Sequence, residues 1–193
     1  MAVKSRKEWL WWILATSIGW VTFLIIFEGF SFLLFPSLIA SGSLLGFGQW
    51  LVLRRHIPLA RWWLLASLPG WMLTWSYLQV LQGADFIPPQ IFLVMGAIGG
   101  FLGGLLGGSL QWLVLRRYIV GAIKWLFPSI TGTTIGIVVF WLIYWIGLPF
   151  EGILSAIGSY LIIAAALAGI VHGCITGAGW LWLLHQPNPT PTL

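Results

Sequence analysis

Six long apolar stretches, joined by short turns, constrain this chain more than any other feature of its sequence. A helix needs about 20 apolar residues to cross the roughly 30 Å hydrocarbon core of a bilayer. The stretches are expected as helices over residues 9–30 (extending as far as 35), 37–53, 62–81, 90–115, 125–146 and 152–184. They occupy nearly all of the 193 residues, so no segment is left for a soluble domain.

The scarcity of charge agrees with a lipid environment. Only 7% of the residues are charged, whereas soluble domains average about 25%, and the mean hydropathy is +0.99. The sequence therefore predicts an all-α polytopic membrane protein with six transmembrane helices. We expect one membrane domain over residues 1–185 and a disordered, proline-rich tail over 186–193. The single cysteine, Cys174, excludes an intramolecular disulfide.

The basic residues all lie on one side of the predicted helices. They precede the first helix or lie between the second and third or the fourth and fifth: Lys4, Arg6, Lys7, Arg54, Arg55, Arg61, Arg116, Arg117 and Lys124. The opposite turns carry Asp85 and Glu151, with Glu28 nearby. Because basic segments stay in the cytoplasm during insertion, both termini are expected there, with the chain in the inner membrane of a cell.

Many tryptophans lie near the same side. Within about two turns of the basic residues are Trp9, Trp11, Trp12, Trp50, Trp62, Trp63, Trp112, Trp125, Trp180 and Trp182. Indole favours the headgroup level of a bilayer, where its ring is buried and its N–H is wet. We interpret these tryptophans as an interfacial belt, and a role in binding a ligand is the alternative.

The sequence contains an internal repeat. The seven residues Gln49–Arg55 recur without change as Gln111–Arg117. The first, third and fifth helices share a spacing of i, i+4, i+7 in Trp12-Thr16-Gly19, Trp63-Ser67-Gly70 and Trp125-Ser129-Gly132. The second, fourth and sixth helices share a spacing of i, i+4, i+8 in Gly42-Gly46-Trp50, Gly104-Gly108-Trp112 and His172-Thr176-Trp180. Each set lies on one helical face. We predict three tandem two-helix hairpins, over about 9–56, 61–118 and 124–185.

Glycine stripes indicate where these helices pack. Membrane helices associate through close contact of small residues, since lipid tails are as apolar as leucine. Two stripes lie side by side on the fourth helix and one on the sixth: Gly96, Gly100, Gly104 and Gly108; Gly99, Gly103 and Gly107; and Gly169, Gly173 and Gly177.

The glycine-rich approach to Gln-Trp-Leu-Val-Leu-Arg-Arg, followed by a Trp-Trp helix, resembles a group of bacterial multi-pass membrane proteins that is common in cyanobacteria. The similarity covers most of residues 9–125. The third hairpin departs from it, with Gly179 for the glutamine and Leu184-His185 for the arginines. The resemblance implies the same membrane fold and, for a cyanobacterial chain, admits the thylakoid membrane. No activity is established for that group.

Polar residues inside the predicted helices are candidates for contacts between helices. Gln49 and Gln111 lie about one turn inside the cytoplasmic interface, and Thr16, Ser67 and Ser129 share the packing face of the odd helices. A buried amide can bridge neighbouring helices for about 0.6 to 2 kcal/mol. Binding of a substrate by the two glutamines is the alternative.

The basic rim has two interpretations. It comprises Arg54, Arg55, Arg61, Arg116, Arg117 and Lys124, and Arg54 and Arg116 follow a tryptophan by four residues, so that guanidinium and indole can stack. Such a rim can hold anionic lipid at roughly 1 kcal/mol per charge. The alternative is that these residues only orient the chain.

His172 and the acidic residues are further candidates. His172 lies near the middle of the sixth helix, where the other hairpins have glycine. It can ligate a metal or a tetrapyrrole, or bond a hydroxyl such as that of Ser129 or Thr133. Otherwise no cofactor and no metal cluster are expected. The acids of the outer turns, one per hairpin, are read as solvated charges, with a shared cation site as the alternative.

Taken as a whole, the pattern predicts a non-enzymatic protein. It contains no Ser-His-Asp set, no HExxH helix and no paired carboxylates. We expect an accessory, assembly or stabilising subunit of a larger membrane complex, with lipid, a membrane protein or a second copy as partner and no nucleic acid. A small permease or channel is the alternative, and a pigment- or haem-binding protein a weaker one.

Overall fold

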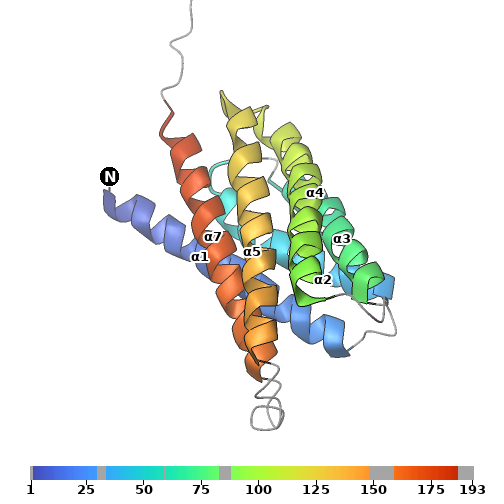
Figure 1. Cartoon of the computed structure of the whole chain (residues 1–193). Helices are drawn as coiled ribbons and strands as arrows, with labels where there is room; N and C mark the ends of the chain where they lie inside the picture. The colour runs from blue at the N-terminus through green and yellow to red at the C-terminus, as the bar shows by residue number, and fades with distance from the viewer. Residues whose placement is uncertain (1, 30–33, 59, 83–87, 148–158, 187–193) are drawn as a thin grey trace, which may run out of the picture.

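The computed structural model of the chain describes residues 2–29, 34–58, 60–82, 88–147 and 159–186, and these form an all-helical bundle (Figure 1). In chain order its α-helices are α1 (Ala2–Gly29), α2 (Leu34–Leu53), α3 (Trp62–Gln82), α4 (Pro89–Leu115), α5 (Leu126–Gly147) and α7 (Ser159–Leu184). A 3₁₀ turn, η2 (Ala122–Trp125), leads directly into α5. It begins after Gly121, whose positive φ of 72° suits a residue without a side chain.

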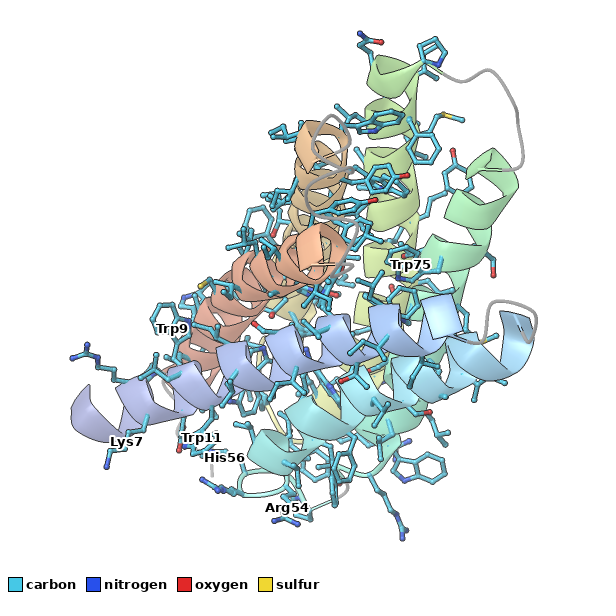
Figure 2. All side chains as sticks on the ribbon, turned by 90° about the horizontal axis from the view of Figure 1, so that it is seen from below. Lys7, Trp9, Trp11, Arg54, His56 and Trp75 are labelled. Carbon is cyan, nitrogen blue, oxygen red and sulfur yellow. The ribbon has the colours of Figure 1, made fainter. Side chains whose placement is uncertain are left out.

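The helices are arranged as a closed ring. Each helix packs against its neighbours in the chain, and α7 also packs against α1, so the last helix meets the first. Figure 1 shows α4, α5 and α7 next to one another, with α1 crossing them at an angle. In the view from below, α1 and α2 run beside each other (Figure 2).

The glycine stripes lie at the closest contacts of this ring. One stripe of α4 faces α5, where a Cβ atom at Gly100 would lie 2.9 Å from the Cα of Thr134. The neighbouring stripe of α4 faces α3, where Gly103 and Gly107 meet Gly70. On α7, a Cβ atom at Gly173 would lie 2.8 Å from the Cα of Ile13 in α1. A larger residue at these points would push the backbones apart.

The helix bounds differ from the predicted ones mainly at α1. This helix begins at Ala2 instead of residue 9, because the intervening Lys, Arg and Glu are good helix formers and no proline or glycine interrupts them. Helix α2 begins at Leu34, and Pro36 is accommodated in its first turn, where a missing N–H costs nothing. The predicted start of the sixth helix lies outside the described residues.

Four segments of the described helices are long and apolar enough to cross a membrane. They are Arg6–Ile26, Gln90–Leu115, Ala122–Ile146 and Tyr160–Leu184. Helix α2 contributes a shorter apolar segment, Gly42–Leu53. Helix α3 is not among the four, since its tryptophans, glutamines and hydroxyl residues lower its hydropathy. Large apolar side chains are exposed around the bundle, among them Val94, Ile146 and Phe127 at 60%, 67% and 73%.

The tryptophans do not form the single belt expected from the sequence. Trp11 and Trp62 are about half exposed, as a belt requires, but Trp12, Trp63, Trp125 and Trp180 are at most 1% exposed. Adjacent residues in a helix point in different directions, so one member of each Trp-Trp pair faces outward and the other faces the ring centre. A second aromatic cluster, with Trp20 and Trp71 among its members, fills the other half of the interior.

Candidate functional site

Three tryptophans meet at the centre of the ring. Trp12 of α1, Trp63 of α3 and Trp125 of η2 hold matching positions in the sequence pattern, and we call them the tryptophan trio. Their ring centroids are 6.2 Å (12–63), 6.0 Å (12–125) and 5.4 Å (63–125) apart, with the rings edge to face. Trp180 of α7 stacks on Trp12 at 5.9 Å. Such pairs contribute about 0.5 to 1.5 kcal/mol each beyond burial, so the trio closes the ring firmly near its basic end.

Two glutamines connect the trio to neighbouring helices. The Trp63 indole donates to Gln49 Oε1 at 2.9 Å, and Gln49 Nε2 donates to Thr16 Oγ1 at 3.4 Å, so this amide joins α1, α2 and α3. Gln111 accepts from Trp125 at 2.8 Å and donates to Ser67 at 2.9 Å, which joins α3, α4 and η2 in the same way. Both amides are buried, so these bonds remove polar groups from the apolar interior.

The third connection uses different residues. The Trp12 indole donates to Thr176 Oγ1 of α7 at 3.0 Å, because Gly179 occupies the position that holds glutamine elsewhere. A Cβ atom at Gly179 would collide with the ring of Pro128, and Pro128 aligns with Ala15 and Ala66 in the predicted repeat. Ser129 therefore has no glutamine partner and donates to the Gly104 carbonyl at 3.1 Å.

His172 is bonded within the interior, but not as the sequence suggested. Its Nδ1 accepts from the Trp20 indole of α1 at 3.0 Å, instead of bonding Ser129 or Thr133 of α5. Those two hydroxyls donate to the carbonyls of Gly104 and Ser129. An Nδ1 that accepts requires the proton on Nε2. His172 is therefore a neutral partner of Trp20, which anchors α7 to α1.

A small polar cavity lies next to the tryptophan trio. It measures about 40 Å³ and is lined by Gln49, Gln111, Ser129, Thr133, His172 and Thr176, among others. Trp71 also lines it, and the buried N–H of Trp71 has no acceptor among the described residues. A cavity of this size holds a few water molecules. It has no room for a tetrapyrrole beside His172.

The basic rim lies at the ends of α2 and α4. As expected from the spacing, the Arg54 guanidinium lies over the Trp50 ring at 5.2 Å, and Arg116 lies over Trp112 at 5.3 Å. The Lys124 ammonium lies over Trp182 at 5.0 Å and donates to Gln186 Oε1 at 3.1 Å. Arg61 is exposed. Figure 2 shows Arg54 near Lys7 and Trp11, at the end of the α1–α2 pair that is far from Trp75.

Two apolar grooves run along the outside of the bundle to this rim. The α1–α2 groove has a volume of about 400 Å³ and reaches Arg54 and Arg55. The α3–α4 groove has a volume of about 460 Å³ and reaches Arg117. Every residue that lines the α3–α4 groove, except Tyr118, has a counterpart in the repeat that lines the α1–α2 groove.

The remaining candidates are the acids of the outer turns and Cys174. Asp85 and Glu151 lie outside the described residues, as does the side chain of Glu28. Cys174 is half-buried, and its carbonyl accepts from the Trp9 indole at 3.3 Å. Within the described ranges, no three His, Cys, Asp or Glu side chains gather in a way that could hold a metal ion.

Sequence reasoning missed three participants. Trp20 was not recognised as a hydrogen-bond donor, although a buried indole N–H usually has an acceptor. Thr176 was placed on the packing stripe, but not as the acceptor for Trp12. The contact of His56 Nε2 with Glu8 Oε1 at 3.3 Å connects the α2–α3 turn to α1, and no sequence pattern predicts it.

No protein-family model matches this chain, and neither a curated protein nor a solved structure matches it.

Proposed function

We propose that the chain is an integral membrane protein of six spans, built from three like-oriented hairpins, with both termini in the cytoplasm. Its support is the apolar exterior, the four helices that are long enough to span, and the basic residues that end α2 and α4. Matching residues also have matching contacts, as in the tryptophan trio and the two glutamine bridges.

We propose further that the protein is not an enzyme and acts through its outer surface, as an accessory, assembly or stabilising subunit of a larger membrane complex. The observation that carries this proposal is the filled interior. The central cavity measures about 40 Å³, whereas sites for small molecules usually measure about 300 Å³ or more. The grooves that exceed this size are on the outside of the bundle.

Affinity purification tests the role as a subunit. The tagged chain is extracted from its native membrane in a mild detergent, and the copurifying proteins are identified by mass spectrometry. We expect a membrane protein in a fixed ratio, recovered again when that partner carries the tag. An unrelated six-span protein, tagged and extracted in parallel, controls for carry-over. Recovery of the chain alone, as a monomer or as its own oligomer, would contradict the proposal.

A small permease is the second candidate, and it is favoured by the lining of the small polar cavity. Gln49, Gln111 and His172 converge there from three helices, and a wet path requires such groups. Flux of small polar solutes into proteoliposomes tests this function. Empty liposomes are the control, and the test variant is Thr133→Val, which removes a hydroxyl from the cavity at nearly constant side-chain volume. Flux that exceeds empty liposomes and falls in this variant would favour the permease over the subunit.

A further inference from the structure

The two outer grooves differ from the rest of the apolar surface because each ends at a charge. Beside each groove, the first arginine of the pair is held over the tryptophan one turn earlier, as Arg54 is over Trp50 and Arg116 over Trp112. The second arginine, Arg55 or Arg117, is exposed and lines the groove. A guanidinium is therefore placed where an apolar channel reaches the basic end of the bundle.

The dimensions of the α1–α2 groove suit one leaflet of a bilayer. Its lining on α1 extends from Trp11 to Thr22, which corresponds to roughly 16 Å along a helix axis. That is about half of the roughly 30 Å hydrocarbon core. Both grooves are lined by side chains such as Leu14, Leu51 and Leu65 and by small residues such as Ala15 and Ala66, which leave space between the helices.

The residues that correspond to the groove and to its second arginine differ in the third hairpin. Pro128 replaces the alanine of the groove, and Trp182 replaces Val52 and Val114. Lys124 lies over Trp182 at 5.0 Å, and Trp182 is about half exposed. His185 stands in place of the second arginine. The residues that line the groove and the second arginine therefore change together in the third hairpin.

We propose that the α1–α2 and α3–α4 grooves are two binding sites for anionic phospholipid of the cytoplasmic leaflet. In each site an acyl chain lies in the groove, and the phosphate of the headgroup is bound by Arg55 or Arg117. A guanidinium matches the geometry of phosphate oxygens and forms charge-assisted hydrogen bonds with them. This inference rests on the proposed membrane embedding and orientation, but not on the role as a subunit.

Native mass spectrometry of the purified full-length chain tests the proposal, with phosphatidylglycerol as the anionic probe and phosphatidylcholine as the zwitterionic one. We expect two retained copies of phosphatidylglycerol, one copy in Arg55→Gln or Arg117→Gln, and none above background in the double variant. Val114→Trp, which introduces the residue of the third hairpin, should remove one copy while every arginine remains.

Matched controls separate these sites from general charge and surface effects. Arg61→Gln removes an exposed arginine that lines neither groove, and Ile135→Trp adds an indole to the exposed face of α5, so both should retain two copies. Melting temperatures check that each variant is folded. Two copies retained by the double arginine variant, or equal retention of phosphatidylcholine, would overturn the proposal. Neither result affects the copurification test, so the two proposals fail separately.

Discussion

His172, which lines the small polar cavity, forms a hydrogen-bonded pair with Trp20 of α1. Besides its bond to Trp20, His172 fills space left by two glycines of α5. A Cβ atom at Gly132 would lie 3.1 Å from His172 Cδ2, and one at Gly136 would lie 3.2 Å from His172 Cβ. The matching positions of the other hairpins hold Gly42 and Gly104, so this contact belongs to the third hairpin alone.

Replacing His172 by the glycine of the other hairpins should destabilise the protein, since the change leaves the Trp20 N–H unpaired and opens a cavity. We expect a double-mutant cycle of His172→Gly and Trp20→Phe to give a coupling energy of roughly 0.6 to 1.7 kcal/mol. The free energy of unfolding is measured by reversible denaturation in mixed micelles. In the control cycle, Trp71→Phe takes the place of Trp20→Phe, because the N–H of Trp71 has no acceptor among the described residues. A coupling energy near zero would contradict the assigned bond.

The sequence predicted that His172 needs a hydrogen-bond partner, but it placed that partner on α5 instead of α1. Periodicity defines the face of α7 on which His172 lies, and that face borders both α5 and α1. The hydroxyls of α5 were nearer in the sequence, whereas Trp20 is separated from His172 by 152 residues. Such a contact depends on how the ring closes, which no local pattern records. The glutamines were easier to predict as bridges, because their repeat places them beside hydroxyls on both neighbouring helices.

Helices α2 and α4 hold matching places in their hairpins, yet their glycines meet different surroundings. A Cβ atom at Gly104 would lie 2.8 Å from the Cα of Ile130 and 3.0 Å from the carbonyl oxygen of Ser129. At Gly42 the nearest atoms would be side-chain carbons of Leu68 and Trp71, at 3.0 and 3.2 Å. Backbone atoms cannot move aside as a leucine side chain can, so the α4–α5 contact is the less tolerant of the two.

Gly104→Ala should therefore destabilise the bundle more than Gly42→Ala, although the repeat pattern alone treats the two positions as equal. We expect a loss of about 1 to 3 kcal/mol in the free energy of unfolding for Gly104→Ala, since it forces two backbones apart. The loss for Gly42→Ala should be less than half of that. Both variants are compared by the same mixed-micelle denaturation. Equal losses would mean that the difference in helix approach is not real.

At the scale of helices, the sequence predicted the bounds of α3 and α4 well, but it did not predict the directions in which adjacent tryptophans point. Helices α3 and α4 begin and end within about one residue of their expected bounds, because prolines or charges mark their ends. The direction of each tryptophan was less predictable. Trp11 and Trp12 are chemically identical and adjacent, so only the packing of the whole ring decides that Trp12 faces inward.

For the whole molecule, the number of spans depends on whether α2 and α3, which are not among the four segments identified as long and apolar enough, also cross the membrane. In the proposed orientation, the exposed Pro58 between them faces the cytoplasm if both cross the membrane. If neither crosses, the same proposal places Pro58 on the outer side, and it places Asp85 outside in both cases.

A cysteine reporter at Pro58, in a chain whose native cysteine is removed by Cys174→Ala, should not react with a membrane-impermeant maleimide on intact cells. A reporter near Asp85 should react, and it serves as the positive control for insertion. One near Arg117 should remain protected. These outcomes follow from the cytoplasmic retention of basic turns. Labelling of Pro58→Cys from outside would leave four spans.

Since α7 packs against α1, the helices form a closed ring. The packing of the ring alone therefore does not require that any one hairpin is synthesised first. A circularly permuted chain tests this consequence. It begins at Gly121, beside the exposed Val120, joins the old termini through a flexible Gly/Ser linker, and ends at Val120. Every hairpin keeps its direction, so we expect insertion in the same orientation and a melting temperature close to that of the parent. A permuted chain that inserts but has a much lower melting temperature than the parent would mean that the α1–α7 contact depends on synthesis in the natural order. Packing alone would then not be enough to close the ring.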